Sequence, residues 1–301
     1  MESVKIKSYI KNIKLKEIVS PNEDVDILVS EVNRIGLQLV KYYKHFSPKR
    51  IQIVGNSEWS YLNELTSEKR RSIAVKLMSY DIPCIVFTRN LEVFDEFIEE
   101  ANKLNVSILQ SKYHTTKFIS KSSEYLDRVL AKKITVHGVL VDVYGIGILI
   151  FGKSGVGKSE TALELIKRGH RFIADDAIII RRLGETQLIG ESPEIIKNLL
   201  ELRGIGIIDI SRLYGIGSVR EEKQIDLVIE FEEWDKKKSY DRLGLDDKYT
   251  TLLDIDISKL SIPIRPGRNL AMIVEAAAIN HRQKCMGFNA AEKLEKRLLN
   301  N

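Results

Sequence analysis

The stretch LIFGKSGVGKSETALELIKRG, from Leu149 to Gly169, decides the fold of the second half of the chain. An apolar run typical of a buried strand ends at Gly152, and a pattern typical of an amphipathic helix begins around Ser159. Gly169 stands where a glycine commonly ends such a helix. The order strand, glycine-rich loop and helix predicts a phosphate-binding loop at a helix N-terminus.

The loop fits the pattern G-x-x-x-x-G-K-[ST] at every fixed position. In such a loop the backbone N–H groups converge on phosphates, and the helix dipole adds positive potential. We expect the Lys158 side chain to reach the β- and γ-phosphates and the Ser159 hydroxyl to bind Mg²⁺. A plain glycine-rich turn is the alternative, but the flanking pattern favours a site for a nucleoside triphosphate. The predicted nucleotide-binding residues are Gly152, Lys153, Ser154, Gly155, Val156, Gly157, Lys158 and Ser159.

The composition is typical of a soluble protein with one or two domains. Of 301 residues, 44% are apolar and 30% are charged. The net charge of +5, from 47 basic and 42 acidic residues, is spread along the chain, so nucleic acid is not an expected partner. Cys84 and Cys285 match no metal or redox spacing, which favours a reduced, cytoplasmic protein.

Neither a secretory signal nor a membrane span is expected. The lysine-rich start MESVKIKSYIKNIKLK has no apolar core of the signal-peptide type. The most apolar segment, residues 136–151, is shorter than a membrane span and contains Asp142. We therefore expect no membrane partner.

The first half of the chain alternates apolar runs with helical patterns. Residues 50–55, 84–89 and 106–111 read as buried strands, and residues 59–79 and 93–105 between them show helical spacing. This alternation predicts a small parallel sheet with covering helices. Because no glycine-rich phosphate loop follows these strands, we expect a role in assembly or regulation.

The junction between the two domains is expected near residue 130. Residues 122–133 read as a helix capped by Ser122 or Ser123. We therefore expect an amino-terminal α/β domain at 1–130 and a phosphate-loop domain at 131–301. At the start of the second domain, residues 134–152 predict a tight β-hairpin that leads into the loop.

Two neighbouring acids, Asp175 and Asp176, follow the helix after the loop, at the end of the run HRFIADD. Neighbouring side chains on a strand point to opposite faces. Only one of the two can then point squarely at the γ-phosphate, which predicts different roles for them. A turn that ends the strand is the alternative interpretation.

A second acid, Glu201, lies in the segment ESPEIIKNLLELRGIGIIDI. We expect a helix here, capped by Ser192, with Pro193 at its first position and Gly204 at its end. The helix dipole disfavours an acid in the last turn, so Glu201 suggests a metal or a partner charge. A solvated glutamate is the commoner explanation, and the residues alone leave both open.

Two further residues have open roles. His137 lies in an apolar, strand-like run, where a single histidine is more often structural than catalytic. Arg242 lies in the polar segment KKKSYDRLGLDDKY, whose charges would usually face solvent. The residue pattern alone assigns neither of them to a site.

The segment IPIRPGRN predicts a stiff turn that displays Arg265 and Arg268. Asn269 then caps a helix that ends at Gly287. Two arginines beside a helix N-terminus make an anion site, and ordinary surface arginines are the alternative.

Taken together, these segments resemble bacterial HPr kinase/phosphorylase. The matching stretches are TVHGVLVDVYGIG, GKSGVGKSETALELIKRGHRFIADD, ELRGIGIIDI, DRLGLDD and IPIRPGRN, in the family's order. The segments EVNRIGLQLV and TTKFIS extend the likeness into the first half. One departure is Ile35, where the family pattern has proline; it concerns the amino-terminal domain.

The resemblance implies an ATP-dependent kinase that phosphorylates a serine of the phosphocarrier protein HPr and removes the phosphate by phosphorolysis with inorganic phosphate. This activity would control carbon catabolite regulation. The implied kinase domain is similar to the core of phosphoenolpyruvate carboxykinase, and the implied assembly is a homohexamer in the cytoplasm.

The resemblance also implies roles for single residues. Lys158 would bind the phosphates, Ser159 and Glu201 would bind Mg²⁺, and Asp176 would be the acid and base. His137 and Arg242 would be active-site partners. Residues 200–209 would serve both reactions, and the turn Pro263, Ile264, Arg265, Pro266, Gly267 and Arg268 would serve mainly dephosphorylation.

Two other functions remain open on the sequence: a phosphate-loop kinase that acts on a small metabolite, and a nucleotide-gated regulator that transfers no phosphate. A pure binder needs no acid or base, so Asp176, Glu201 and the two arginines favour an enzyme.

Overall fold

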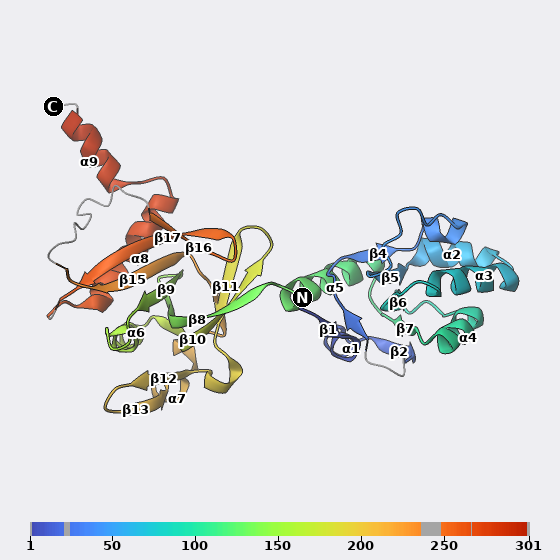
Figure 1. Cartoon of the computed structure of the whole chain (residues 1–301), viewed down its shortest axis with the longest axis horizontal. Coiled ribbons are helices and arrows are strands. Elements are labelled where there is room, and N and C mark those ends of the chain that lie inside the picture. The colour runs from blue at the N-terminus through green and yellow to red at the C-terminus, as the bar shows by residue number, and fades with distance from the viewer. Residues whose placement is uncertain (1, 21–24, 236–247, 266, 300–301) are drawn as a thin grey trace. The chain divides into compact units, whose positions relative to one another are not determined.

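The computed structural model describes residues 2–20, 25–235, 248–265 and 267–299 (Figure 1). The chain forms two compact units, residues 1–131 and 132–301. The boundary expected after residue 130 lies one position from this division. Each unit has its own apolar core and its own sheet.

The first unit is built on a five-stranded sheet in the order β2-β7-β6-β5-β4. The three predicted strands are confirmed; they pair in parallel, as does β4, and β2 adds an antiparallel edge. The side chains of β5 and β6 are buried throughout, as expected for strands covered on both faces. The strands are β2 (Lys16–Val19), β4 (Val32–Arg34), β5 (Ile51–Val54), β6 (Cys84–Phe87) and β7 (Ser107–Gln110), and a separate pair is β1 (Val4–Lys5) with β3 (Asp26–Ile27).

The helices of this unit differ in two places from the prediction. The single helix expected over 59–79 is two helices, because the chain turns at Leu65 and Thr66. The helix expected to start at Ser122 begins earlier; Ser122 is buried in its middle and bonds to the Tyr9 hydroxyl at 2.7 Å, so the predicted cap was wrong. The helices are α1 (Ile6–Ile13), η1 (Leu37–Val40), α2 (Asn56–Glu64), α3 (Ser67–Met78), α4 (Asp95–Leu104) and α5 (Thr115–Val129).

The second unit is built on an eight-stranded sheet in the order β14-β11-β10-β8-β9-β15-β17-β16. Strands β9, β15 and β17 are parallel, so their carboxyl ends meet at one edge of the sheet. The remaining pairs are antiparallel. The strands are β8 (Lys133–Val143), β9 (Ile146–Gly152), β10 (Arg171–Leu183), β11 (Gln187–Glu191), β14 (Glu222–Gln224), β15 (Leu227–Glu233), β16 (Lys248–Leu252) and β17 (Ile255–Ile264).

The predicted hairpin, loop and helix of this unit are confirmed. Strands β8 and β9 pair around Tyr144 and Gly145, both with positive φ, as a two-residue hairpin turn requires. Helix α6 (Lys158–Lys167) follows the loop, and Gly169, with φ of 92°, marks its end. Helix α8 (Leu270–Cys285) begins at Asn269, whose side chain accepts a hydrogen bond from the Met272 N–H at 3.0 Å.

The helix expected over 192–204 was wrong. This segment forms a 3-10 turn, η2 (Glu194–Ile196), and then a hairpin of β12 (Leu199–Leu202) and β13 (Gly206–Asp209). Leu200 and Leu202 are buried on one face with Glu201 exposed between them, a period of two. Gly204 and Gly206, with φ of 84° and 98°, supply the turn.

The remaining elements of the unit are α7 (Ile210–Tyr214), η3 (Ile216–Ser218) and α9 (Ala290–Leu299). Within the described ranges, no helix has the length and apolar character needed to cross a membrane.

Candidate active site

The phosphate loop takes a backbone shape that demands glycine. Gly155 and Gly157 have φ of 79° and 95°, in the left-handed region. A Cβ at Gly152 would lie 2.9 Å from the Phe231 carbonyl oxygen, and one at Gly155 would lie 2.6 Å from Arg203 Nη1. The three glycines therefore let the backbone fold tightly at the N-terminus of α6.

The Lys158 side chain is buried and turned back over this loop. Its Nζ donates hydrogen bonds to the carbonyl oxygens of Gly152 at 2.9 Å and Lys153 at 3.1 Å. Lys153, in contrast, is exposed, with its Nζ 3.7 Å from a carboxylate oxygen of Glu233. Only Lys158 of the two contributes to the cavity beside the loop.

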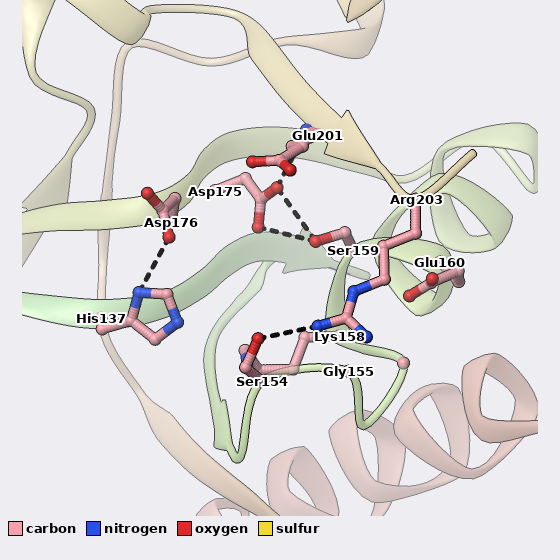
Figure 2. Close-up of a pocket in the computed structure, with 11 residues that line it drawn as sticks. His137, Ser154, Gly155, Lys158, Ser159, Glu160, Asp175, Asp176, Glu201 and Arg203 are labelled. Atoms are coloured by element: carbon pink, nitrogen blue, oxygen red, sulfur yellow. Dashed lines mark hydrogen bonds and ion pairs between the residues drawn. The ribbon is translucent and has the colours of Figure 1, made fainter. Parts of the chain in front are cut away.

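A cavity of about 130 Å³ opens beside the loop (Figure 2). Strands β8 and β10, helix α6 and the β12–β13 hairpin all contribute side chains to it. The lining residues are His137, Ser154, Gly155, Gly157, Lys158, Ser159, Glu160, Asp175, Asp176, Glu201 and Arg203.

Asp175 is the buried acid of the cavity. The Ser159 hydroxyl donates to its carboxylate at 3.0 and 3.1 Å, and the Glu201 backbone N–H donates at 3.2 Å. Burial raises the pKa of Asp175 above its usual range, and the hydrogen bond from Ser159 opposes this in part. These donors are neutral, and within the described ranges no cationic side chain forms a hydrogen bond with the carboxylate of Asp175.

Asp176, in contrast, is exposed at the cavity. Its Oδ1 lies 2.9 Å from His137 Nδ1, on the neighbouring strand β8, and both side chains are more than half exposed. Asp176 has φ of 68°, in the left-handed region, which aspartate tolerates better than most residues other than glycine.

The predicted geometry of the two aspartates was therefore wrong. They do not end a strand, because β10 continues to Leu183, and they do not lie on opposite faces. The positive φ of Asp176 interrupts the alternation, so both carboxylates line the same cavity. Their surroundings still differ, since Asp175 contacts Ser159 and Asp176 contacts His137.

Glu201 enters the cavity from β12, and its backbone bonds to Asp175. Since it lies on a strand, the argument from the helix dipole does not apply to it. Among the described residues no group of three or more His, Cys, Asp or Glu side chains forms a metal site. Mg²⁺ usually binds one or two carboxylates together with substrate phosphates, and the hard oxygen donors of Ser159, Asp175 and Glu201 fit that requirement.

Arg203 was not predicted individually as a site residue, although it lies in the stretch 200–209. From the turn of the hairpin its Nη2 donates to the Ser154 hydroxyl at 3.0 Å, and its guanidinium covers Gly155. The available signal in the sequence was the pair Gly204 and Gly206 just after Arg203, which is typical of a turn. The predicted helix concealed this signal. Glu160, in the first turn of α6, was also not singled out.

The turn after β17 lies at the same edge of the sheet as the phosphate loop, because β9, β15 and β17 are parallel. Arg265 stacks on Trp234, with its guanidinium carbon 3.4 Å from the ring centroid. Arg268 Nη1 donates to the Pro263 carbonyl oxygen at 3.0 Å. Neither arginine lines the cavity described above.

Two of the predicted site residues lie outside the described residues. They are Arg242 and, within the turn, Pro266.

Both units of the chain match models of known protein families. The family model for the HPr serine kinase N terminus matches residues 4–126, and the model for the HPr serine kinase C-terminal domain matches residues 128–298. An HPr kinase/phosphorylase of Caldanaerobacter subterraneus is 54% identical over 99% of this chain and 98% of its own. One of Clostridium botulinum is 53% identical over 94% of this chain and 93% of its own.

Among solved structures, an HPr(Ser) kinase/phosphatase from Coxiella burnetii is similar over 51% of this chain and 99% of its own, at 33% identity and a TM-score of 0.47. The two family models together span nearly the whole sequence. The chain belongs to the HPr kinase/phosphorylase family.

Proposed function

We propose that this protein transfers the γ-phosphoryl group of ATP to a serine of HPr and removes it again with inorganic phosphate, in the control of carbon catabolism. The observation that supports this most strongly is the placement of Asp176, in contact with His137, on the same cavity as the phosphate loop. A protein that only bound nucleotide would need no exposed carboxylate there. Family membership supports the same activity.

The phosphate loop would bind the nucleotide. The first residues of α6 line the cavity, and an anion at a helix N-terminus is stabilised by the free backbone N–H groups there and by the dipole. The ammonium group of Lys158 would leave the loop carbonyls and bind the β- and γ-phosphates. Arg203 would hold the loop in shape through Ser154.

In the forward direction Asp176 would accept the proton of the serine hydroxyl. The serine oxygen forms a bond to the γ-phosphorus as the bond between that phosphorus and the bridging oxygen breaks, which releases ADP. His137 would orient the carboxylate through its contact of 2.9 Å. The exposure of Asp176 leaves room for the side chain of a protein substrate.

In the reverse direction the proton would return by the same path. An oxygen of inorganic phosphate attacks the phosphorus of phosphoserine, the bond from serine oxygen to phosphorus breaks, and pyrophosphate forms. Protonated Asp176 would give its proton to the departing serine oxygen, as microscopic reversibility requires. One residue would then serve both reactions.

Mg²⁺ would be held by Ser159 and Glu201, with Asp175 beside them. Among the described residues, the buried carboxylate of Asp175 accepts hydrogen bonds from a hydroxyl and backbone N–H groups and from no cationic side chain, so it suits a site next to a bound cation. A bound Mg²⁺ would neutralise charge that develops between the phosphates. Arg242 would act as an active-site partner, and Arg265 and Arg268 would stabilise the second phosphate of the reverse reaction.

The hexameric assembly and the cytoplasmic location are further parts of this proposal. Membership of the family is the support for both, and light scattering of the purified protein would measure the number of subunits. The role of the first unit in assembly or regulation is likewise a proposal.

One experiment distinguishes these reactions. The protein is mixed with Mg²⁺, ATP labelled at the γ-phosphate and HPr, with an HPr variant that lacks its acceptor serine as the control. We expect label on HPr only where the serine is present, and we expect unlabelled phosphate to release it as pyrophosphate. Label in a small metabolite would identify a different acceptor, and label that stays in ATP would contradict phosphoryl transfer.

A further inference from the structure

The β12–β13 hairpin displays two exposed isoleucines beside the phosphate loop. Ile205 and Ile207 are 73% and 70% exposed. The turn that contains Ile205 begins at Arg203, which bonds to Ser154 of the loop. This contact holds the turn close to the place where the phosphates would bind, and Figure 2 shows Arg203 and Glu201 together at the cavity.

The strand register places Ile207 on the cavity side of the hairpin. Glu201 pairs with Ile207, and paired residues of antiparallel strands share a face. Glu201 lines the cavity, so Ile207 stands on the same face. The opposite face, with Leu200 and Leu202, is buried in the unit's own core. The hairpin is therefore anchored by the face with Leu200 and Leu202, while Ile207 on the opposite face and Ile205 in the turn remain exposed.

These two side chains have no evident use in binding ATP phosphates. Apolar groups do not stabilise anions, and the phosphate contacts available here come from backbone N–H groups, Lys158 and hydroxyls. Single exposed apolar residues are normal, but exposed isoleucines on the same hairpin as a residue that lines the cavity are positioned to contact a bound partner. The group that must approach this face is the phosphate acceptor.

We propose that Ile205 and Ile207 form an acceptor ledge, against which the surface of HPr around its reacting serine packs. The inference rests on the proposed function. It also explains how the cavity would select a protein: a small hydroxylated metabolite would leave the ledge uncovered, whereas a protein surface around a serine would cover it.

The test compares Ile205→Ser and Ile207→Ser with Ile195→Ser. Ile195 is 93% exposed and lies on η2, outside the hairpin, so it is a matched control for the loss of an exposed isoleucine. We expect each ledge variant to raise the KM for HPr, and for phosphorylated HPr, by at least about fivefold, as for a contact that is important to an interface. The KM for ATP, kcat at saturating HPr and the control variant should change by less than about twofold.

Unchanged KM for HPr in both ledge variants would overturn the proposal, as would an equal change in Ile195→Ser. Light scattering of the same samples tests the alternative occupant: if the ledge variants dissociate the assembly, the face binds a second copy of this chain, which also overturns it. Failure of the unaltered protein to phosphorylate HPr would refute the proposed function itself, an outcome distinct from failure of the ledge.

Discussion

Each unit of the protein contains a parallel strand that leads through glycine into a helix, and the two helix N-termini differ in what occupies them. In the first unit, the Gly55 N–H donates to a carboxylate oxygen of Glu58 at 3.0 Å, and Arg34 pairs with the same carboxylate. Glu58 is buried, and a Cβ at Gly55 would lie 2.8 Å from Thr115 Oγ1. The protein's own acid fills this helix end.

In the second unit the corresponding helix end is left open. The loop before α6 has positive φ at Gly155 and Gly157, and its side chains border the cavity. A strand, a glycine and a helix therefore do not make a phosphate site by themselves. The site requires that the helix's first N–H groups remain without a carboxylate of the protein, and that cations stand nearby.

The largest expected effect is the loss of rate on substitution of Asp176, and it distinguishes the role of Asp176 from that of Asp175. Asp176→Asn should reduce phosphorylation and dephosphorylation by about 10²–10⁴-fold, because it removes the proposed acid and base. ATP affinity should stay near that of the unaltered protein, since Lys158 remains. Initial rates in both directions, with nucleotide binding by calorimetry, provide the measurement. If one direction kept its full rate, a shared acid and base could not be correct, and Asp175 would become the candidate.

Removal of the buried cation comes next. Lys158→Ala should reduce both reactions by about 10²–10³-fold, as for other groups that stabilise transition-state charge. Lys167→Ala is the matched control, because that exposed lysine lies in the last turn of the same helix, away from the loop, and should change the rates by less than about threefold. Circular dichroism of both variants would establish that they are folded. Near-normal kinase activity of Lys158→Ala would rule out its assigned role.

A smaller and selective effect is expected at the turn after β17. Phosphorolysis brings two phosphate groups together, and their repulsion is reduced when cations stand between them. Arg268→Ala, and less strongly Arg265→Ala, should therefore slow dephosphorylation roughly tenfold more than it slows phosphorylation. This loss of rate is smaller than that expected on removal of a buried hydrogen-bond donor from a catalytic site. Arg265→Ala should show the smaller change because Arg265 stacks on Trp234. Equal losses in both directions, with phosphate varied, would contradict an anion role for the turn.

The filled helix end predicts an effect on stability alone. Glu58→Gln should lower the free energy of unfolding by about 1–2 kcal/mol, because a buried, charge-assisted contact to Gly55 and Arg34 is weakened. Urea denaturation measures this change, and kinase rates should remain the same. A large loss of nucleotide affinity in this variant would show that the first helix end has a part in binding.

The parts of the fold that the sequence predicted are those with one clear periodicity. The run that ends at Gly152 and the helix that follows could be predicted because the strand is apolar throughout and the glycines fit a single loop. The hairpin at 199–209 was missed because Ile195, Ile196, Leu199 and Leu200 fit helical spacing, while the period of two covers only a few residues.

The arrangement of the site residues was harder to predict than which residues belong to the site. Asp176, which pairs with Gly138 of β8, has a left-handed backbone, and a sequence of two adjacent aspartates gives no sign of it. The contact of Arg203 with Ser154 joins a hairpin to a loop far away in sequence. Both features arise from tertiary structure, so local spacing could not predict them.

Hydrogen exchange with and without nucleotide tests the central claim most directly, because it observes both helix ends in one sample. On addition of ADP and Mg²⁺, we predict slower exchange in residues 152–162 and unchanged exchange in residues 55–64. Protection at α2, or equal exchange at α6 with and without nucleotide, would contradict the account.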